Sequence, residues 1–289
     1  MRLYSSVIKL TNLHPVTIPT PGGQHAHAAF LDIVRAVDPA LSRTLHDLNG
    51  RKPFTVSPLM GLPKNRQRQE SSDSRVVLRE GLECWLRMTI LDDALFKSFI
   101  DYFMQLPSPS GRGAGGEGRL PQIRLGDARF LVSEILTTPG SHPWAGYVAL
   151  EDLQKRLDEP APDSITLELS SPTSFSLDKN HFELIPYPKL VFGNLAAAWR
   201  AITGENLVEA VEKYAEKNWR PVLHRVERRA MTLHNRPQLG TVGKVEFQRM
   251  DGEDAPLARS LNLLADLAFY TGLGRKTAQG MGMVRQIVR

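Results

Sequence analysis

Four glycines near the end of the printed sequence constrain the fold more than any other feature. They form two Gly-x-Gly pairs within the stretch TGLGRKTAQGMGMVR (residues 271–285): Gly272, Gly274, Gly280 and Gly282. Arg275 and Lys276 lie between the two pairs. Glycine permits positive φ angles and lets another backbone approach closely. Exposed amides and cations together favour a loop that presses against an extended polyanion.

Other loop types fit these glycines less well. A dinucleotide-binding fingerprint needs an acidic residue about 20 positions further on, which the seven residues after Gly282 do not supply. A phosphate loop needs glycine before its Lys-Thr pair, but Arg275 precedes Lys276. The structural alternative is a tight helix-to-strand connection in which Gly272 caps the helix. A helix cap requires only one glycine, so four glycines in this spacing favour a loop that binds a polyanion.

The composition sets broad limits on the class of protein. With 289 residues, 42% of them hydrophobic, the chain can bury one large core or two smaller ones. A net charge of +5 is compatible with a polyanionic partner. Cys84 is the only cysteine, which argues against a disulfide framework and for a reducing compartment. No apolar run is long enough to span a membrane and the N-terminus lacks a signal peptide pattern. We therefore expect a cytoplasmic protein.

Hydrophobic periodicity predicts a ferredoxin-like order in the first half of the chain. The predicted elements are a strand at 2–11, a helix at 25–37, a short helix from Pro39, strands at 54–59 and 82–90, a helix at 92–106, and a strand or hairpin at 123–137. Residues 107–122 are rich in Gly, Ser and Pro, which predicts a flexible loop.

The second half repeats this order. The predicted elements are a strand at 164–169, helices at 190–202 and 206–217, strands at 220–233 and 243–250, a helix at 255–270, and a last strand at 281–288. The predicted fold class is α+β, with two tandem ferredoxin-like folds, each an antiparallel sheet with helices on one face. We divide the chain into an N-terminal domain, 1–145, which carries the candidate active site, and a C-terminal domain, 146–289, which carries the glycine-rich loop.

The glycine loop resembles that of a known superfamily. With Leu273 and Met281 as its apolar positions, it has the GhG-xxxxx-GhG pattern of the RAMP superfamily of CRISPR-associated proteins. The stretches DPALSRTLHDLNGRKPFTVSPL (38–59) and PYPKLVFGNLAAAW (186–199) resemble the repeat-processing endoribonucleases of that superfamily. The resemblance covers nearly the whole chain.

The resemblance implies a function and a chemistry. Such enzymes cut CRISPR precursor RNA within its repeats to make guide RNAs, without a metal or other cofactor. A 2′-hydroxyl attacks the scissile phosphate, which gives 2′,3′-cyclic phosphate and 5′-hydroxyl ends. The expected partner is CRISPR repeat RNA, as precursor and as product, while other effector-complex subunits and a homodimer stay open. The alternatives are a non-catalytic RAMP RNA-binding subunit and an unrelated αβ protein whose glycine loop is structural.

The resemblance implies His46 and Lys52 as catalytic residues, because LHDLNGRKPF matches the family pattern. A histidine suits proton transfer and a lysine suits the charge that develops on the phosphate. The alternative is that neither residue is catalytic: His46 would then be a surface or capping histidine near a helix end, where a cation is favourable, and Lys52 a solvent-exposed lysine. His27, on the first predicted helix, is the rival candidate, ahead of His25. Phe30 and Leu31 stand where related enzymes carry a tyrosine, so a third catalytic residue is missing or comes from elsewhere; Tyr4 is a weak candidate.

Two segments are expected to hold RNA. The first is the glycine loop, through Gly272, Gly274, Arg275, Lys276, Gln279, Gly280 and Gly282. The second is the basic segment RPVLHRVERRAMTLHNRPQ (220–238), through Arg225, Arg229 and Arg236. Strand alternation predicts that Arg225 and Arg229 share one face. Arg66, Arg68 and Arg75 form a further basic connector that could become ordered on RNA.

Overall fold

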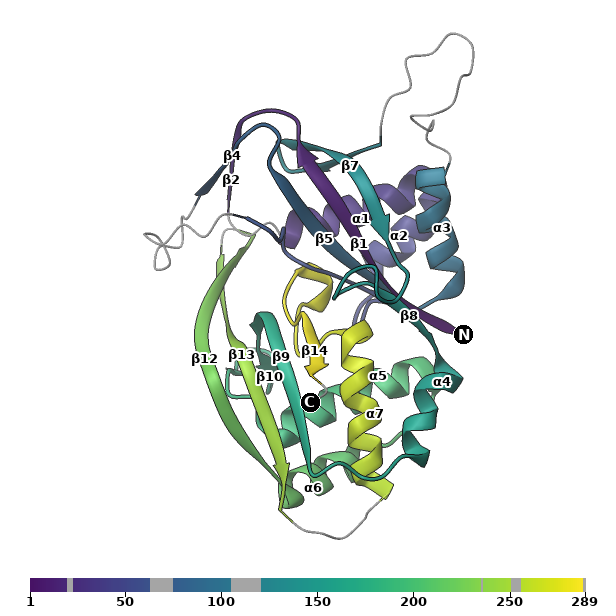
Figure 1. Ribbon diagram of the computed structural model, residues 1–289, viewed down its shortest axis with the longest axis vertical. Coiled ribbons are helices and arrows are strands. Elements are labelled where there is room, and N and C mark those ends of the chain that lie inside the picture. The colour runs from purple at the N-terminus through teal and green to yellow at the C-terminus, as the bar shows by residue number, and fades with distance from the viewer. Residues whose placement is uncertain (20–22, 63–74, 105–120, 235, 251–255, 288–289) are drawn as a thin grey trace.

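The computed structural model contains two ferredoxin-like folds, one above the other in Figure 1. It describes residues 1–19, 23–62, 75–104, 121–234, 236–250 and 256–287. Most of the loop predicted at 107–122 lies outside the described residues, as do Arg66, Arg68 and the side chain of Arg75.

The first domain is an antiparallel sheet with the strand order β3-β5-β1-β7-β6. Its strands are β1 (Arg2–Asn12), β3 (Phe54–Val56), β5 (Glu83–Ile90), β6 (Gln122–Leu125) and β7 (Ala128–Leu136), while β8 (Gly146–Ala149) pairs with the start of β1. A separate ribbon joins β2 (Val16–Pro19) and β4 (Arg75–Leu78). One face of the sheet carries α1 (Gly23–Val37), α2 (Pro39–Asp47) and α3 (Asp93–Met104) (Figure 1). Ala26, Phe30 and Ile33 recur at helical spacing, so they share one face of α1. That face packs into the core of the first domain, and all three are buried.

The second domain repeats this arrangement, with the strand order β12-β13-β9-β14. Its main strands are β9 (Ser164–Thr173), β12 (Trp219–Leu233), β13 (Arg236–Arg249) and β14 (Val284–Ile287), and β10 (Phe175–Ser176) and β11 (Phe182–Glu183) form a small ribbon. The helices are α4 (Leu150–Gln154), α5 (Pro188–Thr203), α6 (Val208–Asn218) and α7 (Pro256–Thr271), with short 3₁₀ turns η1 (Lys155–Asp158) and η2 (Thr277–Gln279). The predicted fold class of two tandem ferredoxin-like folds is confirmed.

A bulge interrupts the long hairpin of β12 and β13. The register shifts between His224 and Glu227, and Arg225 has a φ of 50°. An extra residue on one strand moves the following side chains to the opposite face. The prediction that Arg225 and Arg229 share a face is therefore wrong.

The glycine loop is packed against protein backbone. Gly272, Gly274, Gly280 and Gly282 all have positive φ angles, from 65° to 94°. A Cβ on Gly282 would lie 2.1 Å from the carbonyl oxygen of Leu273, and one on Gly274 would lie 2.3 Å from that of Ser174. The missing Cβ atoms thus let the loop close on itself and on the end of β9. The last strand begins at Val284 instead of the predicted 281 because the loop extends to residue 283.

Gly282→Ala is expected to destabilise the protein much more than Gly204→Ala. Gly204 also has a positive φ of 80°, but nothing lies within 4 Å of a Cβ built there. The control therefore carries only the left-handed backbone term, about 1–2 kcal/mol, whereas Gly282→Ala adds overpacking of about 1–3 kcal/mol. Urea unfolding of both variants checks this. Equal losses would contradict the packing described for Gly282.

Candidate active site between the two domains

The glycine loop of the second domain meets the start of α1 and strand β3 of the first. Ala278 of η2 packs into the hydrophobic core of the first domain. A Cβ on Gly23, the first residue of α1, would lie 2.2 Å from the carbonyl oxygen of Gln279, and one on Gly280 would lie 2.8 Å from Cα of Gly23. Glycines on both sides of this contact therefore allow backbone to touch backbone.

His27 lies at this junction. Its Nδ1 is 2.7 Å from the carbonyl oxygen of Ala278, and its ring stacks on Phe54 with a centroid distance of 5.5 Å. A carbonyl oxygen only accepts, so Nδ1 carries the proton of this hydrogen bond. In the neutral ring the lone pair then belongs to Nε2, the atom that a general base would use.

The surroundings of His27 favour its neutral form. Burial lowers the pKa of His27 most, and the hydrogen bond to Ala278 opposes that effect. Positive charge on Lys52, His46 and His234 lowers the pKa further. These three side chains come from α2, the turn after it and the β12–β13 hairpin, so elements of both domains converge on His27.

Helix α2 begins and ends at clear local signals. The side chain of Asp38 accepts hydrogen bonds from the amides of Ala40 and Leu41 at 3.0 and 2.9 Å, and Pro39 occupies the first turn. Both features favour a helix start. The chain then reverses at Gly50, whose φ is 100°. This reversal returns residues 51–53 past the C-terminal end of α2.

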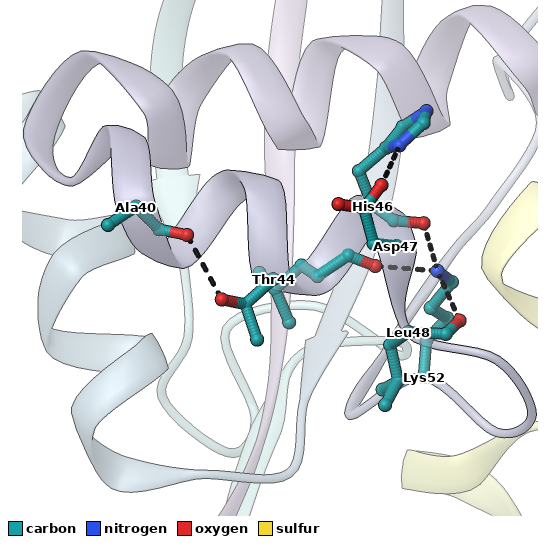
Figure 2. A network of polar contacts seen from close by, with 7 residues as sticks. Ala40, Thr44, His46, Asp47, Leu48 and Lys52 are labelled. Carbon is teal, nitrogen blue, oxygen red and sulfur yellow. Dashed lines mark hydrogen bonds and ion pairs between the residues drawn. The ribbon is translucent and has the colours of Figure 1, made fainter.

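Lys52 caps that end of α2 (Figure 2). Its Nζ donates to the carbonyl oxygens of Leu45, His46 and Leu48 at 2.5, 2.8 and 2.8 Å. The last carbonyls of a helix lack helical partners and carry partial negative charge, so an ammonium is stabilising there. Burial lowers the pKa of Lys52, and Asp47 opposes this. The predicted pair is thus brought together, with Lys52 bound to the backbone of His46.

The His46 ring projects from the end of α2 (Figure 2). Its side chain is 72% exposed, and its Nδ1 lies 2.9 Å from Oδ1 of Asp47. This contact directs one ring nitrogen to the protein and leaves Nε2 for a ligand. His46 is thus open to solvent where His27 is half-buried.

Asn194 of α5 links the loop after α2 to the glycine loop. Its Oδ1 accepts from the Gly274 amide at 2.9 Å and from Nη2 of Arg51 at 3.3 Å, and its backbone oxygen accepts from the same Nη2 at 3.2 Å. A cleft of about 610 Å³ opens beside these contacts, lined in part by Arg51, Lys52 and residues 274–278.

Three of the cations predicted for RNA binding lie at this junction: Lys276, Arg275 and Arg236. Lys276 donates to Oε1 of Gln238 at 3.0 Å, and its pKa is lowered by burial and by the charges of Arg275 and Arg236. The guanidinium of Arg275 lies 5.1 Å from the centre of the Phe182 ring. Arg229, on the hairpin, is ion-paired with Glu227.

Two weaker candidates lie elsewhere. The ring of His25 lies 3.2 Å from a Cβ built on Gly126, in the β6–β7 turn. The Tyr4 hydroxyl donates to Oδ1 of Asp93 at 2.7 Å, and its ring stacks on Phe96 at 3.7 Å. The pKa of Tyr4 is raised by burial and by Asp93.

Sequence reasoning missed several residues of this junction. Arg51 and Asn194 lie 143 positions apart, and the amide of His234 at the hairpin tip donates to Oε1 of Gln24. No local pattern marks contacts between residues so distant in sequence. The predicted duplication of the ferredoxin-like fold indicates that two domains could touch, but it does not indicate which residues meet.

The described residues contain neither a cluster of metal-ligating side chains nor a membrane-spanning helix. Nowhere in the described ranges do three or more His, Cys, Asp or Glu residues gather in a way that could hold a metal ion. None of the helices described is both long and apolar enough to cross a membrane.

Family models match most of the chain, and solved structures match nearly all of it. Residues 2–155 match the CRISPR Cas6 N-terminal domain, and residues 167–284 match the CRISPR-associated endoribonuclease Cas6. No curated protein matches.

The structural matches show the same fold. A product complex of Thermus thermophilus Cas6 is 24% identical, with a TM-score of 0.77 and coverage of 99% of each chain. Another Cas6, bound to a substrate mimic, is 22% identical with a TM-score of 0.68, covering 99% of this chain and 100% of that one. A Cas6-related protein from Pyrococcus furiosus is 13% identical with a TM-score of 0.59, covering 99% and 98%.

The environment of His27 predicts a pH dependence of stability. Because the pKa of His27 is lowered in the folded state, the unfolded chain binds this proton first, near pH 6.5. The contribution of His27 is thus complete above about pH 6.5 and is lost as pH falls through the lower folded value.

Replacing His27 should weaken the dependence of the free energy of unfolding on pH in this range. His27→Asn keeps a donor near the Nδ1 position but does not titrate, so its free energy of unfolding should fall less between pH 7 and 5 than that of the wild type. His14→Asn, at an exposed position, is the control and should follow the wild type. If the free energy of unfolding of His27→Asn fell with pH as steeply as that of the wild type, the lowered pKa assigned to His27 would be contradicted.

Proposed function

Because the chain belongs to the Cas6 family of CRISPR-associated endoribonucleases, we propose that it cuts CRISPR precursor RNA within the repeats and releases guide RNAs. The observation that carries the proposal is the hydrogen bond of His27 to the glycine loop. In the neutral ring this bond selects the tautomer with Nε2 as the basic atom, beside the basic surface to which a phosphate backbone would be drawn.

His27 and His46 divide the proton transfers in the proposed reaction. Nε2 of His27 takes the proton of the 2′-hydroxyl, whose oxygen attacks the adjacent phosphorus. The bond from phosphorus to the 5′-oxygen breaks, and exposed His46 gives that oxygen a proton. The products are a 2′,3′-cyclic phosphate and a 5′-hydroxyl. Two histidines in different surroundings supply base and acid, so the proposed step requires no metal.

Lys52 supports the reaction through position and charge. Its three hydrogen bonds to carbonyl oxygens fix the end of α2 from which His46 projects. The ammonium also adds positive charge near the phosphorane, where negative charge increases in the transition state. Lys52 therefore joins His46 and His27 in the proposed site.

The glycine loop and the β12–β13 hairpin would hold the RNA. Arg275 and Arg236 lie close enough to Lys276 for their charges to lower its pKa, and such a group of cations attracts the phosphate backbone. Gly272, Gly274, Gly280, Gly282 and Gln279 shape the loop that presents these cations. Arg225 and Arg229 would add positive charge along the hairpin, one on each of its faces.

Cleavage of the repeat RNA of the host's own CRISPR array, in EDTA, tests the proposal. The wild type should cut, leaving cyclic phosphate ends, and a 2′-deoxy substitution at the mapped scissile nucleotide should block cutting without weakening binding. His27→Ala and His46→Ala should each lower the single-turnover rate by about 10²–10⁴-fold, the usual contribution of a general acid or base. His14→Ala, at an exposed position outside the candidate site, is the control and should cut normally.

Each other outcome has a definite meaning. Cutting that requires a divalent metal would overturn the proposed chemistry. Full activity of His27→Ala would remove that residue from the base role, and full activity of His46→Ala would remove it as the acid. Tight binding without cutting by the wild type would instead identify a non-catalytic RNA-binding subunit.

A further inference from the structure

An aromatic side chain outside all predicted site residues stands beside the glycine loop. Phe182 of β11 is 44% exposed, which is high for a phenylalanine in a folded domain. The guanidinium of Arg275 lies over its ring, 5.1 Å from the centroid. This geometry is a cation–π contact. The ring is therefore held from one side by a residue of the loop that borders the candidate active site.

The β10–β11 ribbon is fixed in place. Ser176 of β10 pairs with Phe182, and the carbonyl oxygen of Leu184 accepts from Oγ1 of Thr241 on β13 at 2.7 Å. The Arg275 amide donates to the Ser174 carbonyl at 2.9 Å, just before β10. The backbone of Arg275 and the strand that carries Phe182 are thus both held at the C-terminal end of β9, the first by Ser174 and the second by Ser176. An aromatic ring on a rigid support loses little entropy when a ligand stacks on it.

The charges around Phe182 indicate what kind of ligand it suits. Arg275 and Arg236 both lie near Lys276, and in the described part of the chain neither Arg275 nor Lys276 is ion-paired with a carboxylate. Asp178, on the same ribbon, is bound by the His181 ring and by the amides of Asn180 and His181. A flat apolar ring within a positive field suits a base attached to a phosphate backbone better than it suits an apolar protein surface.

Phe182 is also close to the proposed chemistry. Arg275 is three residues from Ala278, whose carbonyl binds His27, and three residues span at most about 11 Å. Phe175, Ser176 and residues 274–278 line the same cleft as Lys52. A nucleotide on Phe182 would therefore lie within a few nucleotides of a phosphate at His27.

We propose that Phe182 and Arg275 form a stacking platform for an unpaired base of the RNA next to the cleavage site. The inference rests on the proposed function, because the base belongs to the RNA that His27 and His46 would cut. The platform would select RNAs in which that nucleotide is free to leave a helix. It would add affinity and register without taking part in proton transfer.

Matched aromatic variants test the platform. Phe182→Ala should weaken binding of repeat RNA that carries a 2′-deoxy scissile nucleotide by about 5- to 160-fold, the range for loss of one stacked base. Phe182→Tyr should restore binding, because the ring is kept, and Phe182→Leu should not. The single-turnover rate at saturating protein should stay within about threefold of the wild type. Tyr147→Ala is the control, since Tyr147 is 45% exposed under Arg2 on the far strand β8.

Abasic substitutions in the RNA identify the partner base. At one unpaired position near the cut, removing the base should weaken wild-type binding about as much as Phe182→Ala does, and Phe182→Ala should then have no further effect. If Phe182→Ala weakened the binding of every abasic RNA by the same factor, the proposed platform would be overturned. It would also be overturned if Phe182→Ala left RNA affinity unchanged, the result expected if the ring docks a protein.

The two proposals fail in different ways. A wild-type protein that neither binds nor cuts repeat RNA would overturn the proposed function and the platform with it. Binding and cutting that are indifferent to Phe182 would overturn the platform alone.

Discussion

The hydrogen bond between His27 and the Ala278 carbonyl joins the two domains at the point where chemistry is proposed. It forms only because the glycine loop can press against the start of α1. Gly280 and Gly23 meet there without side chains, and each would clash if it carried a Cβ. The positive φ angles of the loop turn its backbone so that Ala278 enters the core of the first domain. The two Gly-x-Gly pairs therefore serve the fold and the candidate site through one contact.

A second contact fixes the relative position of the domains. Arg87 of β5 is fully buried, and it donates to Oγ of Ser5 at 2.8 Å and to the carbonyl oxygens of Trp144 and Phe269. Its guanidinium lies 5.1 Å from the Trp144 ring centre and 4.3 Å from that of Phe269 on α7. Burial lowers its pKa to about 9. A buried cation is costly unless its hydrogen bonds are made, so the structure strongly favours the domain arrangement that supplies these partners.

Local signals made much of the fold predictable. Apolar periodicity predicted the main helices and strands, and Asp38-Pro39 and Pro188 marked two helix starts. The spacing of the four glycines predicted an unusual loop, although sequence alone favoured free amides over a closely packed backbone. In the structure the amides of Gly272, Leu273, Gly274 and Gly282 all donate to protein acceptors. The loop would thus act on RNA mainly by placing Arg275 and Lys276.

The parts that escaped prediction depend on long-range geometry. The bulge at Arg225 is accommodated by Gly243 on the partner strand, a pairing that local strand alternation does not predict. Lys52 was predicted as a catalytic charge, and its role as the cap of α2 appears only in its hydrogen bonds to three backbone carbonyls. His27 ranked behind His46 because nothing near it in sequence predicts that a carbonyl 251 residues away will select its tautomer. Asn194 and Phe182 gain their significance in the same way.

Nitrogen-15 NMR of the histidine rings, recorded as a pH titration, tests the central contact most directly. Long-range nitrogen–proton correlations distinguish the two neutral tautomers of each ring, and a His27→Asn sample assigns the His27 signals. The account predicts that neutral His27 carries its proton on Nδ1 and titrates below the ordinary pKa of about 6.5. A neutral His27 protonated on Nε2, or a pKa above that value, would contradict it.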